Sequence, residues 1–240
     1  MLLVKIIVTA DAATRDQVIR ATNKQTTVTD ASLRATDVVQ RQIEDYFLTQ
    51  GWYYDRRKNF YKNEGKDTSK IIGIPYLGAA MTAMGLSRPD KSRGKPSSLL
   101  KNNDDYGLVF SPSIDLAIYL WSARLQLSVD SFIASDDAKA SLDQRNNLRF
   151  HLSMLIVEQL NNGPIRKPQQ LGSLAVLNAS LIQSEIEKLF DVLKKWADEY
   201  LAVESMILER AAKSQRFSDY LLKKASERRT VAEANSGGVD

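Results

Sequence analysis

The 240-residue chain has no cysteine and only one histidine, His151. The absence of cysteine excludes a disulfide scaffold, a thiolate zinc site and a cysteine nucleophile. A single histidine excludes most histidine-based metal sites and weakens any Ser-His-Asp proposal. We therefore expect no metal and no cofactor. A chain without cysteine also fits a cytoplasmic location.

Long apolar runs are scarce as well. The longest uncharged stretch, residues 71–86, contains Pro75 and three glycines and is shorter than the ~18 apolar residues of a membrane span. The mostly apolar residues 1–8 lack the basic segment and the small-residue cleavage site of a secretory signal. Because 43% of the residues are hydrophobic, the composition is not that of a disordered chain. We expect a soluble, cytoplasmic protein with no membrane partner.

Positive charge is present but unevenly placed along the chain. The net charge is +4, yet residues 52–101 hold eleven Lys and Arg against four acidic residues, a balance of +7, which leaves −3 for the rest. Such a concentration in a loop-rich segment is typical of a surface that contacts a phosphate-bearing partner. The alternative is a basic surface that contacts only solvent.

The sequence predicts β structure near the N-terminus. The nearly continuous apolar residues 2–8 predict a strand buried on both faces. A buried strand needs neighbours and none precede it, so we expect the chain to be a fragment of a longer protein. Residues 33–50 predict a helix that Gly51 ends. The aromatic residues of 52–61 predict a hairpin with residues 56–58 at its tip.

From residue 72 onward the pattern is helical. The expected elements are a short alanine-rich helix at 74–86, a basic loop with a helical turn at 87–103, an extended or irregular insert at 106–110, amphipathic helices through 114–132 and 148–156, a break at 163–168 and a last helix at 182–207. The fold class is therefore mainly α with a small β element near the N-terminus (α+β), and a helical bundle in the C-terminal half. The expected division is a truncated α+β domain at 1–70, a helical domain at 71–230 and a disordered tail at 231–240.

The last predicted helix has the most regular pattern in the chain. Its apolar residues from Ile182 to Ile207 are spaced alternately by four and three, which is typical of a coiled-coil seam. Phe190, Ala197 and Leu201 widen this stripe, as the core of a helical bundle requires. Two interpretations stay open: a helix packed inside its own chain, or a homodimer through the Ile182–Ile207 helix.

Signatures of a catalytic site are absent from the sequence. It contains no glycine-rich nucleotide motif, no P-loop, no G-x-S-x-G and no H-E-x-x-H. The acidic pairs Asp104-Asp105 and Asp136-Asp137 fall in predicted loops, where turn and cap roles are commoner than catalysis. We therefore name no catalytic residue.

The predicted hairpin is the best candidate for a binding site, because its aromatic residues are interleaved with cations. Aromatic rings stack on bases and cations contact phosphates, a combination typical of single-stranded nucleic-acid binding. The alternative is a hairpin whose rings are core and whose tip is only solvated. The candidate DNA- or RNA-binding residues are Tyr53, Tyr54, Arg56, Arg57, Lys58 and Lys62.

Several blocks of the sequence together resemble the AIPR family, the bacterial abortive-infection phage-resistance proteins. The main blocks are Val18-Ile19-x-Ala21-Thr22-Asn23-x-Gln25-Thr26-x-Val28, Leu33-Arg34-Ala35-x-Asp37-x-x-Gln40 and Tyr53-Tyr54-x-Arg56-Arg57. Shorter ones are Tyr76-Leu77-x-Ala79, Arg88-Pro89 and Asp105-Tyr106-Gly107-Leu108-Val109-Phe110. The resemblance implies that the polar positions of the family motif are Asn23, Gln25, Arg34, Asp37, Gln40, Tyr54, Arg56 and Arg57.

The resemblance also implies a function. Family members are usually longer and often carry a nuclease-like region upstream, so this chain resembles their C-terminal part. Its partners would then include a missing N-terminal part or a partner subunit. We expect a recognition or regulatory module of an anti-phage protein that contacts DNA or RNA. The alternatives are an assembly module without nucleic-acid binding and, less favoured, part of a nuclease active site.

Overall fold

The computed structural model describes residues 29–94, 96–176 and 179–236, and it confirms a mainly helical fold with a small β element. The strand expected at residues 2–8 lies outside the described residues, as do Asn23 and Gln25. In chain order the elements are α2 (Asp30–Arg34), α3 (Val38–Thr49), β1 (Tyr53–Asp55), α4 (Phe60–Asn63), η1 (Thr68–Lys70), β2 (Ile71–Gly73), α5 (Ile74–Gly85), α6 (Pro89–Gly94), α7 (Pro96–Lys101), α8 (Asn103–Val109), α9 (Leu116–Ala134), α10 (Leu142–Leu160), η2 (Pro168–Ser173), α11 (Ala179–Glu204), α12 (Leu208–Ala211) and α13 (Gln215–Ser236).

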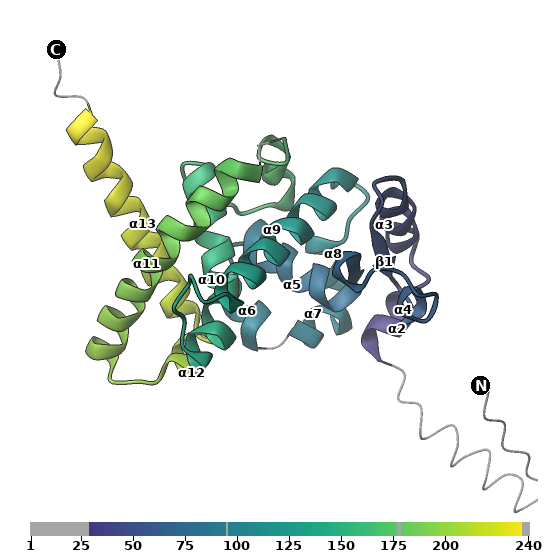
Figure 1. The fold of residues 1–240 in the computed structure, drawn as a ribbon, viewed down its shortest axis with the longest axis horizontal. Coiled ribbons are helices and arrows are strands. Elements are labelled where there is room, and N and C mark those ends of the chain that lie inside the picture. The colour runs from purple at the N-terminus through teal and green to yellow at the C-terminus, as the bar shows by residue number, and fades with distance from the viewer. Residues whose placement is uncertain (1–28, 95, 177–178, 237–240) are drawn as a thin grey trace, which may run out of the picture.

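Helix α10 is the centre of the bundle. It contacts α5, α6, α9, α11 and α13, and these helices surround it in Figure 1. Ser141 and Gln144 form a capping box that starts α10, since each side chain accepts a hydrogen bond from the other residue's backbone. Side chains on several faces of α10 are buried, as expected for a helix enclosed by others. One apolar cluster continues from Val39 to Ala225.

Close packing explains the small residues of α5. A Cβ placed on Gly78 would lie 2.9 Å from Leu99 Cδ2 of α7 and 3.3 Å from Phe110 Cε2. Both distances are shorter than a comfortable contact, so glycine lets α7 and the end of α8 approach α5 directly. The prediction of a short, closely packed helix at 74–86 is confirmed.

The predicted hairpin at 52–61 is wrong. The first aromatic run does form β1, but β1 pairs in parallel with β2, in the register Tyr53 to Ile71, Tyr54 to Ile72 and Asp55 to Gly73. The second aromatic run starts helix α4. The Asp55 carboxylate accepts hydrogen bonds from the backbone amides of Asn59, at 2.6 Å, and Tyr61, at 3.3 Å. These bonds turn the chain into α4, so the basic residues lie in the crossover between two parallel strands.

Other expected boundaries also change. The helix expected at 33–50 is interrupted, because Asp37 has extended backbone angles and starts α3 as a separate helix. Gly51, with φ of +72°, follows it as expected. The expected basic loop at 87–103 contains α6 and α7, and the expected irregular insert at 106–110 belongs mostly to α8. The Asn102 side chain starts α8 by accepting a hydrogen bond from the Asp104 amide.

The regular apolar stripe of α11 faces the inside of the chain. Its members Ile182, Ile186, Leu189, Leu193, Trp196 and Tyr200 are all buried, whereas Val203 and Ile207 are exposed. Helix α11 ends at Glu204, and α12 and α13 then return along it (Figure 1). Helix α13 continues to Ser236, so residues 231–236 of the expected disordered tail are helical, and residues 237–240 lie outside the described residues.

The only histidine of the chain predicts a pH effect on stability. His151 is fully buried in α10; its Nδ1 lies 3.2 Å from the Asn147 carbonyl, and its ring lies 5.1 Å from that of Phe217. Burial lowers the pKa of His151 to about 4, against which the Asn147 carbonyl and Asp90 act to raise it, while Arg93 lowers it further. Between pH 6.5 and 4 the unfolded chain therefore binds a proton that the folded chain does not, and stability falls as the pH falls.

We expect the free energy of unfolding to drop by about 2 kcal/mol between pH 7 and pH 5 through this group. Urea unfolding at both pH values measures the drop, and the variant His151→Gln should lose it, because glutamine does not titrate. An equal drop in the variant would mean that carboxylates, and not His151, cause it.

Candidate nucleic-acid interface

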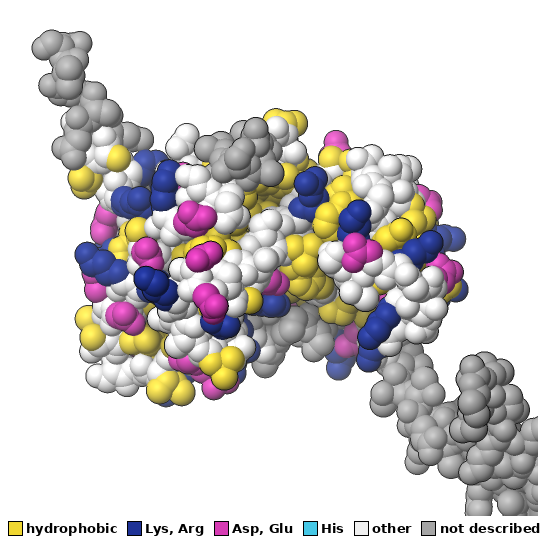
Figure 2. Space-filling view, in the orientation of Figure 1, with side chains coloured by type: hydrophobic (Ala, Val, Ile, Leu, Met, Phe, Trp, Pro, Cys, Tyr) yellow, Lys and Arg dark blue, Asp and Glu magenta, His cyan; other side chains and the backbone are white. Residues whose placement is uncertain are grey.

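Lysine and arginine side chains are concentrated in the crossover from β1 to β2. We define the α4 surface as the exposed side chains of Arg57, Lys58, Lys62, Lys66 and Lys70, together with the rings of Tyr53 and Phe60. Figure 2 shows dark-blue cationic side chains, with magenta acidic ones between them, at the end of the molecule formed by α2 to α4. The basic segment predicted from charge is therefore exposed here as a folded surface rather than as a hairpin tip.

Aromatic rings lie in contact with two of these cations. Tyr61 is buried, and the half-buried rings of Tyr53 and Phe60 pack against it with centroids 5.2 Å and 5.0 Å away. The Arg57 guanidinium lies 4.5 Å above the Phe60 ring, and Lys66 Nζ lies 5.6 Å from the Tyr53 ring. Such cation–π contacts hold flexible side chains near the aromatic faces that a base would stack on.

A cavity of about 600 Å³ opens beside the α4 surface, at the carboxyl ends of β1 and β2. Its lining is mainly apolar and includes Ile74, Pro75 and Leu100. Its charged members are the cations Arg56 and Lys58 and the carboxylates Asp30 and Asp55. Parallel strands end at the same edge of their sheet, so ligand-binding crevices often form there. The arrangement places an apolar hollow directly next to exposed positive charge.

Two of the predicted binding residues are engaged in contacts inside the fold. Tyr54 is fully buried, and its hydroxyl donates to Gln40 Oε1 at 2.5 Å. Burial raises the pKa of Tyr54 well above its usual value, so the hydroxyl stays protonated. Arg56 is largely buried, donates to the Ala35 carbonyl and pairs with the Glu44 carboxylate at 2.5 Å. Both residues stabilise the fold, whereas Tyr53, Arg57, Lys58 and Lys62 remain accessible.

Three of the polar motif positions, Arg34, Gln40 and Tyr54, take part in an internal network. Gln40 is fully buried; it accepts from Tyr54 and donates through Nε2 to the Tyr106 hydroxyl at 2.9 Å. The Arg34 guanidinium lies 4.1 Å above the Tyr106 ring and donates to the Leu100 carbonyl at 2.9 Å. These contacts join α2, α3, β1, α7 and α8. We conclude that Arg34 and Gln40 hold the N-terminal elements onto the helical core.

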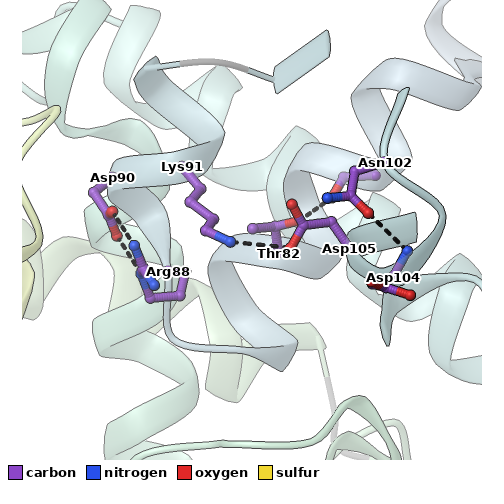
Figure 3. Close-up of polar contacts among 8 residues, drawn as sticks. Thr82, Arg88, Asp90, Lys91, Asn102, Asp104 and Asp105 are labelled. Atoms are coloured by element: carbon purple, nitrogen blue, oxygen red, sulfur yellow. Dashed lines mark hydrogen bonds and ion pairs between the residues drawn. The ribbon is translucent and has the colours of Figure 1, made fainter. Parts of the chain in front are cut away.

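The acidic pair Asp104-Asp105 takes part in local contacts, which Figure 3 shows. Asp105 pairs with Lys91 at 3.1 Å, and the Asp104 amide donates to the Asn102 side chain. Nearby, Arg88 makes two bonds to the Asp90 carboxylate, at 2.9 and 2.7 Å. Within the described part of the chain, no three His, Asp or Glu side chains lie close enough to share a metal ion.

Sequence reasoning did not select Lys66 and Lys70 as site residues. The excess of positive charge in residues 52–101 did include them, because both belong to that basic segment. Their place on the α4 surface depends on the turn after α4, where Gly65 adopts φ of +74°. The parallel pairing of β1 with β2 then fixes the path of the chain.

Comparison with known proteins gives one match. A family model described as AIPR protein matches residues 1–229, nearly the whole chain. No curated protein and no solved structure matches. Among the helices that the structure describes, none combines the length and apolar character needed to cross a membrane.

Proposed function

The chain belongs to the AIPR family, the abortive-infection phage-resistance proteins, and on that premise we propose that it recognises nucleic acid through the α4 surface. The family links it to defence against phage. The observation that carries the proposal is the set of five exposed cations around two accessible aromatic rings. Cations neutralise phosphates and rings stack on bases, so the surface offers both contacts of a nucleic-acid strand.

The cavity next to Lys58 favours a single strand as the ligand. Bases of a single strand are free to leave the strand axis and enter a pocket, whereas bases in a duplex stay stacked. The mainly apolar lining suits the face of a base, and Lys58 at the same place suits its phosphate. Contacts to phosphates alone would not distinguish a single strand from a duplex.

The test is fluorescence anisotropy of the full chain with labelled single- and double-stranded DNA and RNA, at low and physiological salt. We expect binding that weakens with salt and is tightest for a single strand. The triple variant Arg57→Gln, Lys58→Gln and Lys62→Gln removes three exposed charges. It should weaken binding at least about tenfold and reduce the salt slope by about 2, because each lost phosphate contact to a single strand removes about 0.7.

A matched control separates this surface from net charge. Lys195→Gln, Lys223→Gln and Arg228→Gln also remove three exposed cations, but from α11 and α13. Both triple variants change the net charge from +4 to +1. Equal losses in the two variants would show that binding follows overall charge and not the α4 surface. A wild-type chain that binds none of the four polymers would refute the proposal.

A further inference from the structure

A second cationic site lies away from the α4 surface, between α6 and α10. It is a hollow of about 380 Å³ lined by Ser92, Arg93, Arg145, Asn146, Arg149 and Phe150. We call it the arginine hollow. None of its lining residues is acidic, so three guanidinium groups share one concave space. In Figure 1, α6 and α10 lie towards the middle of the long axis, whereas α4 lies near one end.

Arg93 and Arg149 each make one side-chain hydrogen bond. Arg93 Nε donates to Asn147 Oδ1 at 2.9 Å, and its two terminal nitrogens have no partner in the described part of the chain. Arg149 Nη1 donates to Asp130 Oδ2 at 3.0 Å, and its guanidinium lies 4.4 Å from the Phe150 ring centroid. Both side chains are therefore oriented while most of their N–H groups remain open to a ligand.

The third arginine is anchored to the end of a neighbouring helix. Arg145 donates to the Ala140 carbonyl through Nε and to the Ala134 carbonyl through Nη1, both at 3.0 Å. Ala134 is the last residue of α9, so the charge also compensates the carbonyl end of that helix. Nη2 of Arg145 has no protein partner among the described residues.

The charge of the hollow is only partly compensated. Among the described residues, Arg149 pairs with the Asp130 carboxylate, whereas Arg93 and Arg145 make no ion pair. Arg93 lies near enough to Glu209 of α12 to help lower the pKa of that carboxyl, and all three arginines are half-buried. Like charges repel more strongly in a partly buried hollow than in open water. Because the contacts within the protein already fix the guanidinium groups, an anion would bind without a large loss of side-chain freedom. Oriented guanidinium groups match the oxygens of a phosphate group.

We propose that the arginine hollow binds a phosphate group of a phosphate monoester or a pyrophosphate. Arg93 and Arg149 donate to it from two sides, and Arg145 donates from the first turn of α10. The exposed Asn146 amide adds a neutral donor at the same place. The site is separate from the α4 surface, so the two proposals succeed or fail independently.

The test uses calorimetric titration and thermal unfolding of the full chain with sodium pyrophosphate and orthophosphate, at ionic strength matched by sodium chloride. We expect saturating pyrophosphate to raise Tm by about 5 °C, since a ligand that binds only the folded state stabilises it. Asn146→Asp adds a negative charge to the hollow without removing any of the arginine contacts. It should weaken pyrophosphate binding at least tenfold.

The matched control is Asn162→Asp, the same substitution at an exposed position just past the other end of α10. It should bind pyrophosphate like the wild type. A second variant, Arg93→Gln, should also lose binding. Equal binding by Asn146→Asp and the wild type, or a Tm rise that sodium chloride reproduces, would overturn the proposal.

The same titration distinguishes a nucleic-acid backbone from a small phosphorylated molecule as the source of the bound phosphate. An unlabelled oligonucleotide with hydroxyl ends is added to the pyrophosphate complex. Displacement of the pyrophosphate would mean that the hollow binds backbone phosphodiesters and would overturn its assignment to a monoester or pyrophosphate. Retention of pyrophosphate at saturating oligonucleotide identifies a small phosphorylated molecule as the ligand. The triple variant of the α4 surface should leave pyrophosphate binding unchanged.

Discussion

Leu193→Asp is expected to abolish cooperative folding of the chain. Leu193 is fully buried in the middle of α11, in the core shared with α10 and α13. A carboxylate there would have to lose its hydration without gaining a partner, at a cost of at least about 5 kcal/mol, comparable to the whole stability of many domains. Circular dichroism during heating measures the outcome, and we expect a broad or missing transition.

The control comes from the same apolar repeat. Val203 occupies the next part of the predicted seam but is 80% exposed, so Val203→Asp should change the stability by less than about 0.5 kcal/mol. A dimer through this helix predicts a different result, because both substitutions would then yield folded monomers. Sedimentation of the two variants distinguishes these cases, and a folded monomeric Leu193→Asp would contradict the packing of α11 described above.

This helix shows which parts of the fold the sequence could predict. Helices α9, α10 and α11 are long, and in α11 the apolar positions repeat with the helical period over several turns. Such a pattern depends only on neighbours within the helix, so it can be recognised without knowing the fold. Whether the apolar face of α11 meets the same chain or another depended on its packing against α9, α10 and α13, which the pattern within one helix does not contain.

Shorter elements could not be predicted in the same way. Helices α6, α7 and α8 have six or seven residues each, too few to be stable alone. They depend on packing against α5, for example where Leu99 lies over Gly78, and on the bond between Tyr106 and Gln40. The parallel pairing of β1 with β2 likewise depends on a crossover, which a pattern of aromatic residues does not reveal.

The candidate interface was predicted at the level of a segment but not of each residue, and nucleic-acid binding there stays a prediction. Charge counting located a stretch of exposed basic residues, because charge is a property of composition. It could not separate Arg56 from Arg57, which are adjacent and chemically identical. Their roles differ because Glu44 of α3 lies beside Arg56, while Arg57 lies over the Phe60 ring at the surface. We therefore expect Arg56→Gln to lower the stability and Arg57→Gln to weaken nucleic-acid binding instead.

Arg56→Gln is expected to destabilise the chain by about 3 kcal/mol, which corresponds to a Tm lower by about 6 to 12 °C. The Glu44 side chain is only 11% exposed and would lose the arginine that pairs with it. The Tyr61 hydroxyl, which donates to Glu44 at 2.9 Å, is a neutral partner and cannot replace that charge. Urea unfolding measures the loss.

Arg57→Gln is the matched control, because it makes the same substitution at the next position. It should leave the stability within about 1 kcal/mol of the wild type, since it removes only an exposed cation–π contact, yet it should weaken nucleic-acid binding.

Adding Glu44→Gln to Arg56→Gln should recover part of the lost stability, because the buried carboxylate is then replaced by a neutral amide that needs no counter-charge. If Arg56→Gln instead kept full stability and lost binding, Arg56 would belong to the interface, as its place in the basic run first suggested. If the double variant were no more stable than Arg56→Gln alone, the loss would come from the bond to the Ala35 carbonyl rather than from the unpaired charge of Glu44.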